Sequence, residues 1–241
     1  MGLGMLLVLV VTAGGPPVAL QTVAVGVVTC RVITVDMTDP RVRVDLILAQ
    51  GFPGGDESFA SMLSRTRPVA AINGAYFSKQ TLLPIGDLAQ RGELRHSGRM
   101  GTVFTLDAQR RMDIQRVVRH RTYQWPEAQV ALGCGPALVL DGQIDVRWAD
   151  EGFRDPHVTG RTARMGLGYT ERGKLKLVNA AAPLSFEGFA RVMQSLGCHE
   201  AMNLDSGASQ ALYFQGKTLL RPGRKLTTVL GVWVDPLSPA R

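Results

Sequence analysis

The sequence predicts a single α+β domain, a β-rich mixed sheet with a few packed helices, from three observations. Runs of alternating β-branched and polar residues recur along most of the chain. Only two segments have the three-to-four-residue apolar spacing of a helix. The 241 residues include 27 glycines and 13 prolines, so the chain turns often, which excludes long helical bundles. Since no repeat or linker interrupts residues 31–235, we expect one domain over that range.

The chain begins with the pattern of an export signal. Residues 3–11 are almost all apolar and are soon followed by two glycines and two prolines at 14–17, a run too short to cross a bilayer. We expect a signal peptide over residues 1–22, with the mature protein beginning between about residues 14 and 30. The protein is then exported, to the periplasm, the cell envelope or the extracellular space, with no stable membrane insertion after processing. A buried N-terminal strand is the alternative, because no lysine or arginine precedes the apolar run.

Strand patterns dominate the first half of the domain. Residues 31–37 and 41–49 alternate like strands around Asp39-Pro40 and are predicted to form a hairpin-like pair. Either Asp56 or Ser58 is predicted to cap a short helix, which presents Phe59, Met62 and Leu63 on one face and ends before Pro68. Further strands are expected at residues 68–73, 83–89, 101–106 and 111–118.

The second half contains two predicted hairpins and the second helix. Residues 137–144 turn at Gly142, and residues 164–170 and 174–180 flank a tight turn. Ser185 is predicted to cap a helix closed by Gly197. The apolar side of this helix carries Phe186, Phe189, Met193 and Leu196. The last strands are expected at residues 200–205, 210–216 and 227–234.

The net charge of +7 is concentrated in one stretch. Eight arginines lie between Arg91 and Arg121, against Glu93, Asp107 and Asp113. A nucleic-acid patch is one interpretation, but only one aromatic residue interleaves with these arginines, whereas alternating arginines are typical of the solvated face of exposed strands. We therefore expect no nucleic-acid partner.

Several common sites are disfavoured by residue spacing. The cysteines and histidines show no CxxC or HxxxH pattern, so a structural zinc site is not predicted. Residues 168–174 match the start of a phosphate-binding loop, but Leu175 replaces the magnesium-binding Ser or Thr. Ser206 and Ser209 follow a strand without the G-x-S-x-G turn of a serine hydrolase.

Cys134 and Cys198 are expected to approach each other and bridge in an oxidising compartment, with separate buried thiols as the alternative.

Four segments combine a strand with a glycine-rich turn that carries Asn, Arg or Asp. They are AINGAYF at 71–77, GCGPALVLDG at 133–142, RMGLGYT at 164–170 and LGCHEAMNLDSGASQALY at 196–213. Ordinary turn chemistry accounts for any one of them. If the four turns meet at one rim, however, they form a polar pocket.

The order of these motifs, with a capped helix before NLDSGAS, resembles the phosphodiester glycosidase family. The resemblance covers roughly residues 31–235. It implies a hydrolase that cleaves a sugar-1-phosphodiester at the anomeric carbon, on an envelope or extracellular glycosyl phosphodiester or phosphorylated glycan.

The family motifs map onto individual residues of this chain. Asn73 matches the Asn of NGG[FY]F, and Asp205 and Ser209 match the Asp and Ser of the L-D-G-G-G-S turn. Arg164 resembles the Arg of R-T-A-x-G, with Arg161 as the competing assignment. The resemblance also implies substrate-binding roles for Gly207 and for Arg224, which precedes the last strand, and a site role for Asp87.

Of the positions that depart from the family pattern, three bear on the function. Met165 replaces a Thr, Thr228 stands where many members have Asn, and Ser206 replaces a Gly. If position 206 needs a positive φ, Ser would strain the turn. These departures motivate an alternative function, a non-catalytic module that binds phosphorylated glycans.

The resemblance also implies a division of chemical roles. Phosphate is a good leaving group, so one carboxylate and a cationic phosphate clamp suffice for the hydrolysis. Asp205 is the expected base or nucleophile, with Asp87 as runner-up, and Arg164 is the expected clamp for the phosphate oxygens. No cofactor is implied with certainty. A divalent cation is left open, because Asp and Asn on turns are also ligands for hard cations.

Overall fold

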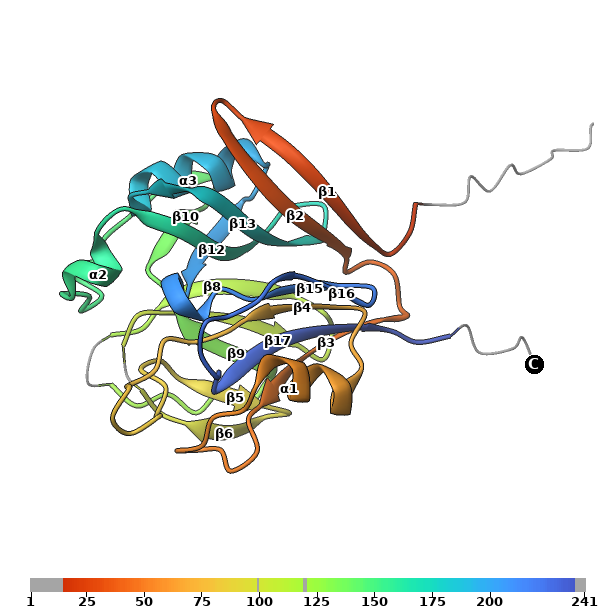
Figure 1. Cartoon of the computed structure of the whole chain (residues 1–241), viewed down its shortest axis with the longest axis vertical. Helices are drawn as coiled ribbons and strands as arrows, with labels where there is room; N and C mark the ends of the chain where they lie inside the picture. The colour runs from red at the N-terminus through yellow and green to blue at the C-terminus, as the bar shows by residue number, and fades with distance from the viewer. Residues whose placement is uncertain (1–14, 99, 119–120, 237–241) are drawn as a thin grey trace, which may run out of the picture.

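The computed structural model describes residues 15–98, 100–118 and 121–236, which form three antiparallel sheets and three short helices (Figure 1). The predicted α+β class is confirmed. The strands are divided among three sheets that share one central core, in place of a single mixed sheet. No helix in the described ranges has the length and apolarity needed to cross a membrane.

The first sheet has seven strands. Their order is β1 (Val18–Val25), β2 (Val28–Asp36), β13 (Lys174–Leu184), β12 (Thr162–Tyr169), β14 (Glu200–Leu204), β10 (Ala137–Leu140) and β11 (Gln143–Ile144). Helix α3 (Phe186–Ser195) packs against this sheet, and Ser185 caps it as predicted. Gly166 on β12 permits this packing, because a Cβ there would lie 2.7 Å from the Phe189 ring.

The second sheet packs against the first of the two predicted helices. Its order is β16 (Lys217–Leu220), β15 (Leu212–Phe214), β4 (Ala70–Asn73), β17 (Thr228–Val234) and β3 (Val42–Leu48). Helix α1 (Phe59–Thr66) buries Phe59, Met62 and Leu63 against it, as the apolar spacing predicts (Figure 1). Of the two candidate caps, Ser58 is the one that accepts the hydrogen bond from the Ser61 amide.

The strands of the third sheet lie closer together in the sequence than those of the other two sheets. Its order is β6 (Glu93–His96), β5 (Leu88–Gln90), β9 (Ala128–Cys134), β7 (Thr102–Asp107) and β8 (Met112–Arg116). A short helix, α2 (Pro156–Thr159), lies in the chain between β11 and β12 of the first sheet. Residues from all three sheets interleave in the central core, so the ends of β4 and β14 are held at one rim.

Two expectations from the sequence are wrong. The strands on either side of Asp39-Pro40 do not pair, because β2 joins β1 and β13 whereas β3 joins β17. Cys134 and Cys198 are free, buried thiols. Cys134 ends β9 in the central core, and Cys198 lies under α3 before β14 begins, at the far end of that strand from the rim.

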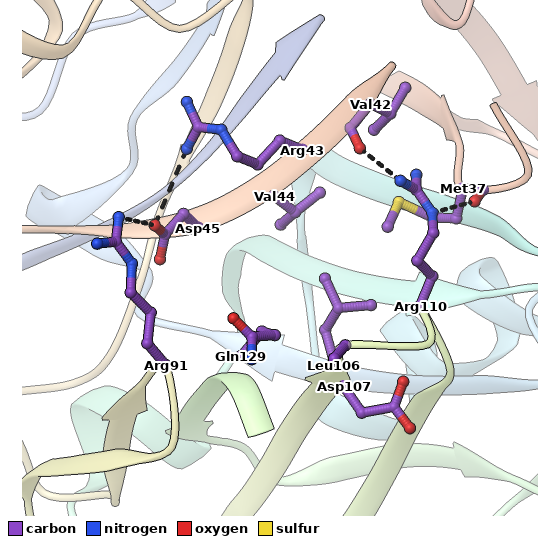
Figure 2. A pocket seen from close by; sticks show the side chains of 11 residues that line it. Met37, Val42, Arg43, Val44, Asp45, Arg91, Leu106, Asp107, Arg110 and Gln129 are labelled. Atoms are coloured by element: carbon purple, nitrogen blue, oxygen red, sulfur yellow. Dashed lines mark hydrogen bonds and ion pairs between the residues drawn. The ribbon is translucent and has the colours of Figure 1, made fainter. Parts of the chain in front are cut away.

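The arginines of the basic stretch largely bind within the protein. Figure 2 shows Arg91 reaching towards Asp45, whereas Arg110 donates to the carbonyls of Met37 and Val42. Arg116 bridges to Asp145 and to the buried Glu151. Arg99, Arg119 and His120 fall outside the described residues. Arg110 and Arg116 therefore stabilise junctions between strands, which differs from the solvated strand face that the sequence pattern predicts.

The pairing of strand β1 with β2 limits where a signal peptide could be cleaved. Residues 1–14 of the predicted signal peptide lie outside the described residues, but residues 18–25 pair along their whole length with β2. Cleavage after residue 22 would remove half of β1 and leave the edge of β2 unpaired. We therefore predict that processing cuts before Val18. N-terminal sequencing of the exported protein checks this, and a mature N-terminus beyond Val18 would contradict it.

Candidate active site

Asp205 immediately follows β14, and its loop is braced by β4. The Asp205 amide donates to the Gly74 carbonyl at 3.2 Å, and Asn73 Nδ2 donates to the Asp205 carbonyl at 2.6 Å. Asn73 Oδ1 accepts from the Ala211 amide at 3.1 Å. Asn73 is thus buried and uses both ends of its amide on the backbone around Asp205. Asn73 therefore positions the backbone of the loop that carries Asp205.

The Asp205 carboxylate is enclosed by hydrogen-bond donors. Its Oδ1 accepts from the Ser206 amide at 2.8 Å, and its Oδ2 accepts from Arg224 Nη2 at 2.9 Å. Arg224 Nε donates to Ser209 Oγ at 2.6 Å, so one guanidinium orients both side chains. Asp205 is 3% exposed, and burial raises its pKa to about 6, although Ser209, Arg224 and Ser206 each act to lower it.

A hollow of about 230 Å³ opens beside this carboxylate. Its lining is Tyr76, Phe77, Lys79, Asp155, His157, Val158, Thr162, Asp205, Ser206, Gly207, Ala208 and Arg224. The Arg224 guanidinium lies 4.5 Å from the centre of the Phe77 ring, and its side chain remains 26% exposed. Two cations, Arg224 and Lys79, and two carboxylates, Asp155 and Asp205, line the hollow. The two cations are the groups that suit an anionic ligand.

We take the hollow beside Asp205, hereafter the Asp205 pocket, as the candidate site because of the residues that line it and not because of its size. The hollow in Figure 2 is larger, about 360 Å³, and is lined by Arg43, Asp45 and Arg91 among others. There, Asp45 Oδ1 already accepts from the Leu46 amide and from Gln90. Residues of the motifs NGAYF and LDSGAS both line the Asp205 pocket.

The turn after Asp205 accommodates Ser206 without strain. Ser206 has φ −126°, an extended conformation open to any residue, so the expected strain from replacing a glycine is absent. The residue with positive φ is Gly207, at +59°, which begins a short 3₁₀ turn ending at Ser209. Gly207 lines the pocket, and Ser209 is buried beneath it.

Arg164 does not lie among the lining residues of the Asp205 pocket. It is fully buried and donates to the backbone carbonyls of Leu184, Val158 and Gly160. Its guanidinium also stacks 4.0 Å from the centre of the Phe186 ring. The guanidinium of Arg164 thus holds the α2 segment, and Arg224 is the arginine that lies beside the Asp205 carboxylate.

We predict that Arg164→Lys acts mainly on stability. Lysine cannot reach three carbonyls at once, and each buried partner left unsatisfied costs about 1–3 kcal/mol. For a domain of this size the midpoint of thermal unfolding should fall by roughly 5–15 °C. Thermal unfolding followed by circular dichroism measures the shift. An unchanged midpoint together with lost activity would return Arg164 to the phosphate-clamp role.

Asp87 and Arg161 also lie outside the lining of the Asp205 pocket. Asp87 is fully buried, and its carboxylate accepts from the Gly98 amide and from Trp125 Nε1. It therefore braces two loops of the third sheet. Arg161 is exposed and donates to the Pro183 carbonyl at 2.9 Å.

Lys79, Asp155 and His157 are lining residues that sequence reasoning missed. They lie on loops or on the four-residue helix α2, where no spacing rule points to a function. Tyr76 and Phe77 belong to the NGAYF motif but were not singled out. Burial raises the pKa of Tyr76 well above its ordinary value, so its phenol stays neutral while it accepts a hydrogen bond from Asn203 Nδ2.

The donor set of the Asp205 pocket favours an anion over a cation. Both Asp205 oxygens accept hydrogen bonds, and one of the donors is the Arg224 guanidinium. A divalent cation bound to this carboxylate would lie beside that positively charged guanidinium, which opposes its binding. Asp155 is the other carboxylate of the lining, and it accepts from the His157 amide at 2.9 Å.

Comparison with known proteins gives one family match. The model of a family described as phosphodiester glycosidase matches residues 66–233, which include β4, β14 and the loop that carries Arg224. No curated protein matches the chain.

Solved structures share the fold at low sequence identity. A hypothetical protein from Synechocystis aligns at TM-score 0.74 and 16% identity, over 91% of this chain and 64% of that one. The catalytic domain of zebrafish N-acetylglucosamine-1-phosphodiester alpha-N-acetylglucosaminidase, auto-inhibited by its pro-peptide, aligns at 0.69 and 16% identity, over 90% and 82%. A putative exported protein from Burkholderia pseudomallei aligns at 0.56 and 16% identity, over 86% and 74%. This chain thus spans about two-thirds of the Synechocystis protein.

Proposed function

Because the chain belongs to the phosphodiester glycosidase family, we propose that it hydrolyses a sugar-1-phosphodiester at the anomeric carbon in the Asp205 pocket. The observation that carries the proposal is the coupled set of Asp205, Arg224 and Ser209 at the edge of a hollow that Lys79 also lines. This set combines a carboxylate of raised pKa with a guanidinium that keeps donors for a second anion.

The proposed mechanism assigns the two charged groups to the two ends of the scissile bond. Arg224 binds the phosphate oxygens and stabilises the charge that develops as the phosphate monoester leaves. Asp205 faces the anomeric carbon and acts as general base for water or as nucleophile. Lys79 adds a second positive charge at the mouth of the pocket. Since phosphate is a good leaving group, a second carboxylic acid is not required.

The substrate class and the location are also proposals. The zebrafish structure is named for an enzyme that removes N-acetylglucosamine from a phosphodiester, and this favours a glycosyl phosphodiester here. The Burkholderia structure is described as a putative exported protein, in agreement with the apolar N-terminal run. We propose that the protein acts after export, on glycans of the cell envelope or the extracellular space.

Release of free sugar from a panel of synthetic sugar-1-alkyl-phosphodiesters tests this function. We expect turnover of at least one diester, and no comparable turnover of the matching alkyl glycoside, which lacks the phosphate for Arg224. Tight binding of the diesters without release of sugar would instead support a non-catalytic glycan-binding module.

A further inference from the structure

A second cluster of potential ligands lies at the other end of β14. Asp141, His199 and Glu200 each offer a ligand atom, and these atoms lie within 4.8 Å of one another. Asp141 belongs to the turn between β10 and β11, whereas Glu200 is the first residue of β14 and His199 immediately precedes it. The strand is five residues long, so this cluster is roughly 15 Å from Asp205. It is therefore separate from the Asp205 pocket.

The imidazole of His199 is placed between two carboxylates. Nδ1 lies 3.4 Å from Glu171 Oε1, and Nε2 lies 4.0 Å from Asp141 Oδ1. The second distance is too long for a hydrogen bond. It is close to the roughly 3.4 Å that separates two ligand atoms on one tetrahedral zinc ion, given bonds of about 2.0–2.2 Å. A carboxylate on the opposite ring nitrogen is the usual partner that orients a metal-bound histidine.

The backbone fixes the members of the cluster relative to one another. The Gly142 amide donates to the His199 carbonyl at 2.8 Å, and the His199 amide donates to the Tyr169 carbonyl at 2.8 Å. The turn that carries Asp141 is thus tied directly to the residue that it faces. The Asp141 side chain is 93% exposed, so a rotation of this one side chain can close the remaining distance.

Glu200 is oriented by hydrogen bonds to only one of its oxygens. Glu200 Oε2 accepts from the Ile114 amide and from Tyr169 Oη, both at 2.8 Å. The residue is 9% exposed and, among the described residues, forms no ion pair with a lysine or arginine. Its neighbours in the cluster include the carboxylate of Asp141. A buried carboxylate with one anchored oxygen and excess negative charge around it is suited to binding a cation.

We propose that Asp141, His199 and Glu200 bind a divalent transition-metal ion, represented by Zn²⁺, as a structural clamp independent of the proposed hydrolysis. One imidazole with two carboxylates favours Zn²⁺ over Ca²⁺ or Mg²⁺, which prefer sets made only of oxygens. Since Glu200 is already bonded to Ile114 of β8, the ion would connect the first sheet to the third. The sequence could not predict this site because Asp141 is distant in the chain and no HxxxH spacing is present.

Calorimetric titration of Zn²⁺ into the whole, chelator-treated protein tests the proposal. We expect one ion per chain with a Kd in the micromolar range or tighter, and a higher midpoint of thermal unfolding when Zn²⁺ is present. His199→Ala and Asp141→Asn should each weaken binding at least tenfold. Asp141 has φ +50°, which asparagine adopts readily, so this variant preserves the turn.

The control is His157→Gln, which removes an exposed histidine on helix α2, away from the cluster, and should leave Zn²⁺ binding unchanged. Equal metal-free unfolding midpoints for all variants would establish that they fold alike. The proposal is overturned if Zn²⁺ does not bind below about 100 µM, if His199→Ala binds it as tightly as the wild type does, or if Ca²⁺ binds equally well.

Discussion

Asp205→Asn is expected to reduce kcat for a sugar-1-phosphodiester by ~10²-fold or more while leaving KM within a few-fold of wild type. The amide neither accepts a proton nor attacks the anomeric carbon, whereas it can still accept the Ser206 amide hydrogen bond that the carboxylate accepts. The substitution thus removes the chemistry and preserves the turn. Steady-state kinetics, with circular dichroism as a check on folding, measures the effect.

The raised pKa of Asp205 also predicts how the rate depends on pH. The proposed role needs the ionised carboxylate, so the rate of the wild type should fall as the pH drops through about 6. Asp150→Asn, which removes an exposed carboxylate outside the lining of the pocket, is the matched control and should retain full activity. A kcat for Asp205→Asn within a few-fold of wild type would remove Asp205 from the mechanism.

Arg224→Met is expected to lower kcat/KM by ~10²- to 10³-fold, the effect of losing one donor that stabilises transition-state charge. It should also move the acidic limb of the pH–rate profile to higher pH. Burial raises the pKa of Asp205 and Arg224 lowers it. Without Arg224 this pKa rises, so the carboxyl group stays protonated up to a higher pH. Arg224→Lys should recover part of the activity compared with Arg224→Met. Lysine restores the positive charge, but it lacks the planar guanidinium that donates to Ser209 and Asp205 at once.

Arg221→Met is the matched control for Arg224. Arg221 is exposed on the same loop and does not line the Asp205 pocket. Its substitution removes the same charge from the surface, so any loss of long-range attraction for an anionic substrate appears in both variants. Equal losses in the two variants, with no shift in the pH profile of Arg224→Met, would reduce Arg224 to a general surface charge.

The helices could be predicted from sequence because their signals are local. Ser58 and Ser185 cap helices whose apolar residues recur within two turns, and both helices lie where the pattern places them. Strand partners could not be predicted in the same way. β2 and β3 are neighbours in sequence, yet each pairs with strands more than one hundred residues away, and only the shared core determines that choice.

The candidate site was predictable where a motif names its residue. Asn73, Asp205, Ser209 and Arg224 are brought together as the motif order suggests. The sequence could not distinguish a buried arginine from one that lines a pocket, so Arg164 was assigned to the phosphate although its donors bind backbone carbonyls.

The position of the cleaved bond tests the central claim most directly. Hydrolysis of a sugar-1-phosphodiester in H₂¹⁸O, followed by mass spectrometry of the products, reports which atom water attacks. Attack at the anomeric carbon transfers the label to the released sugar and leaves the phosphate monoester unlabelled, and this is the expected result, abolished in Asp205→Asn. Label in the phosphate monoester, or unchanged turnover by Asp205→Asn, would contradict a glycosidase mechanism centred on Asp205.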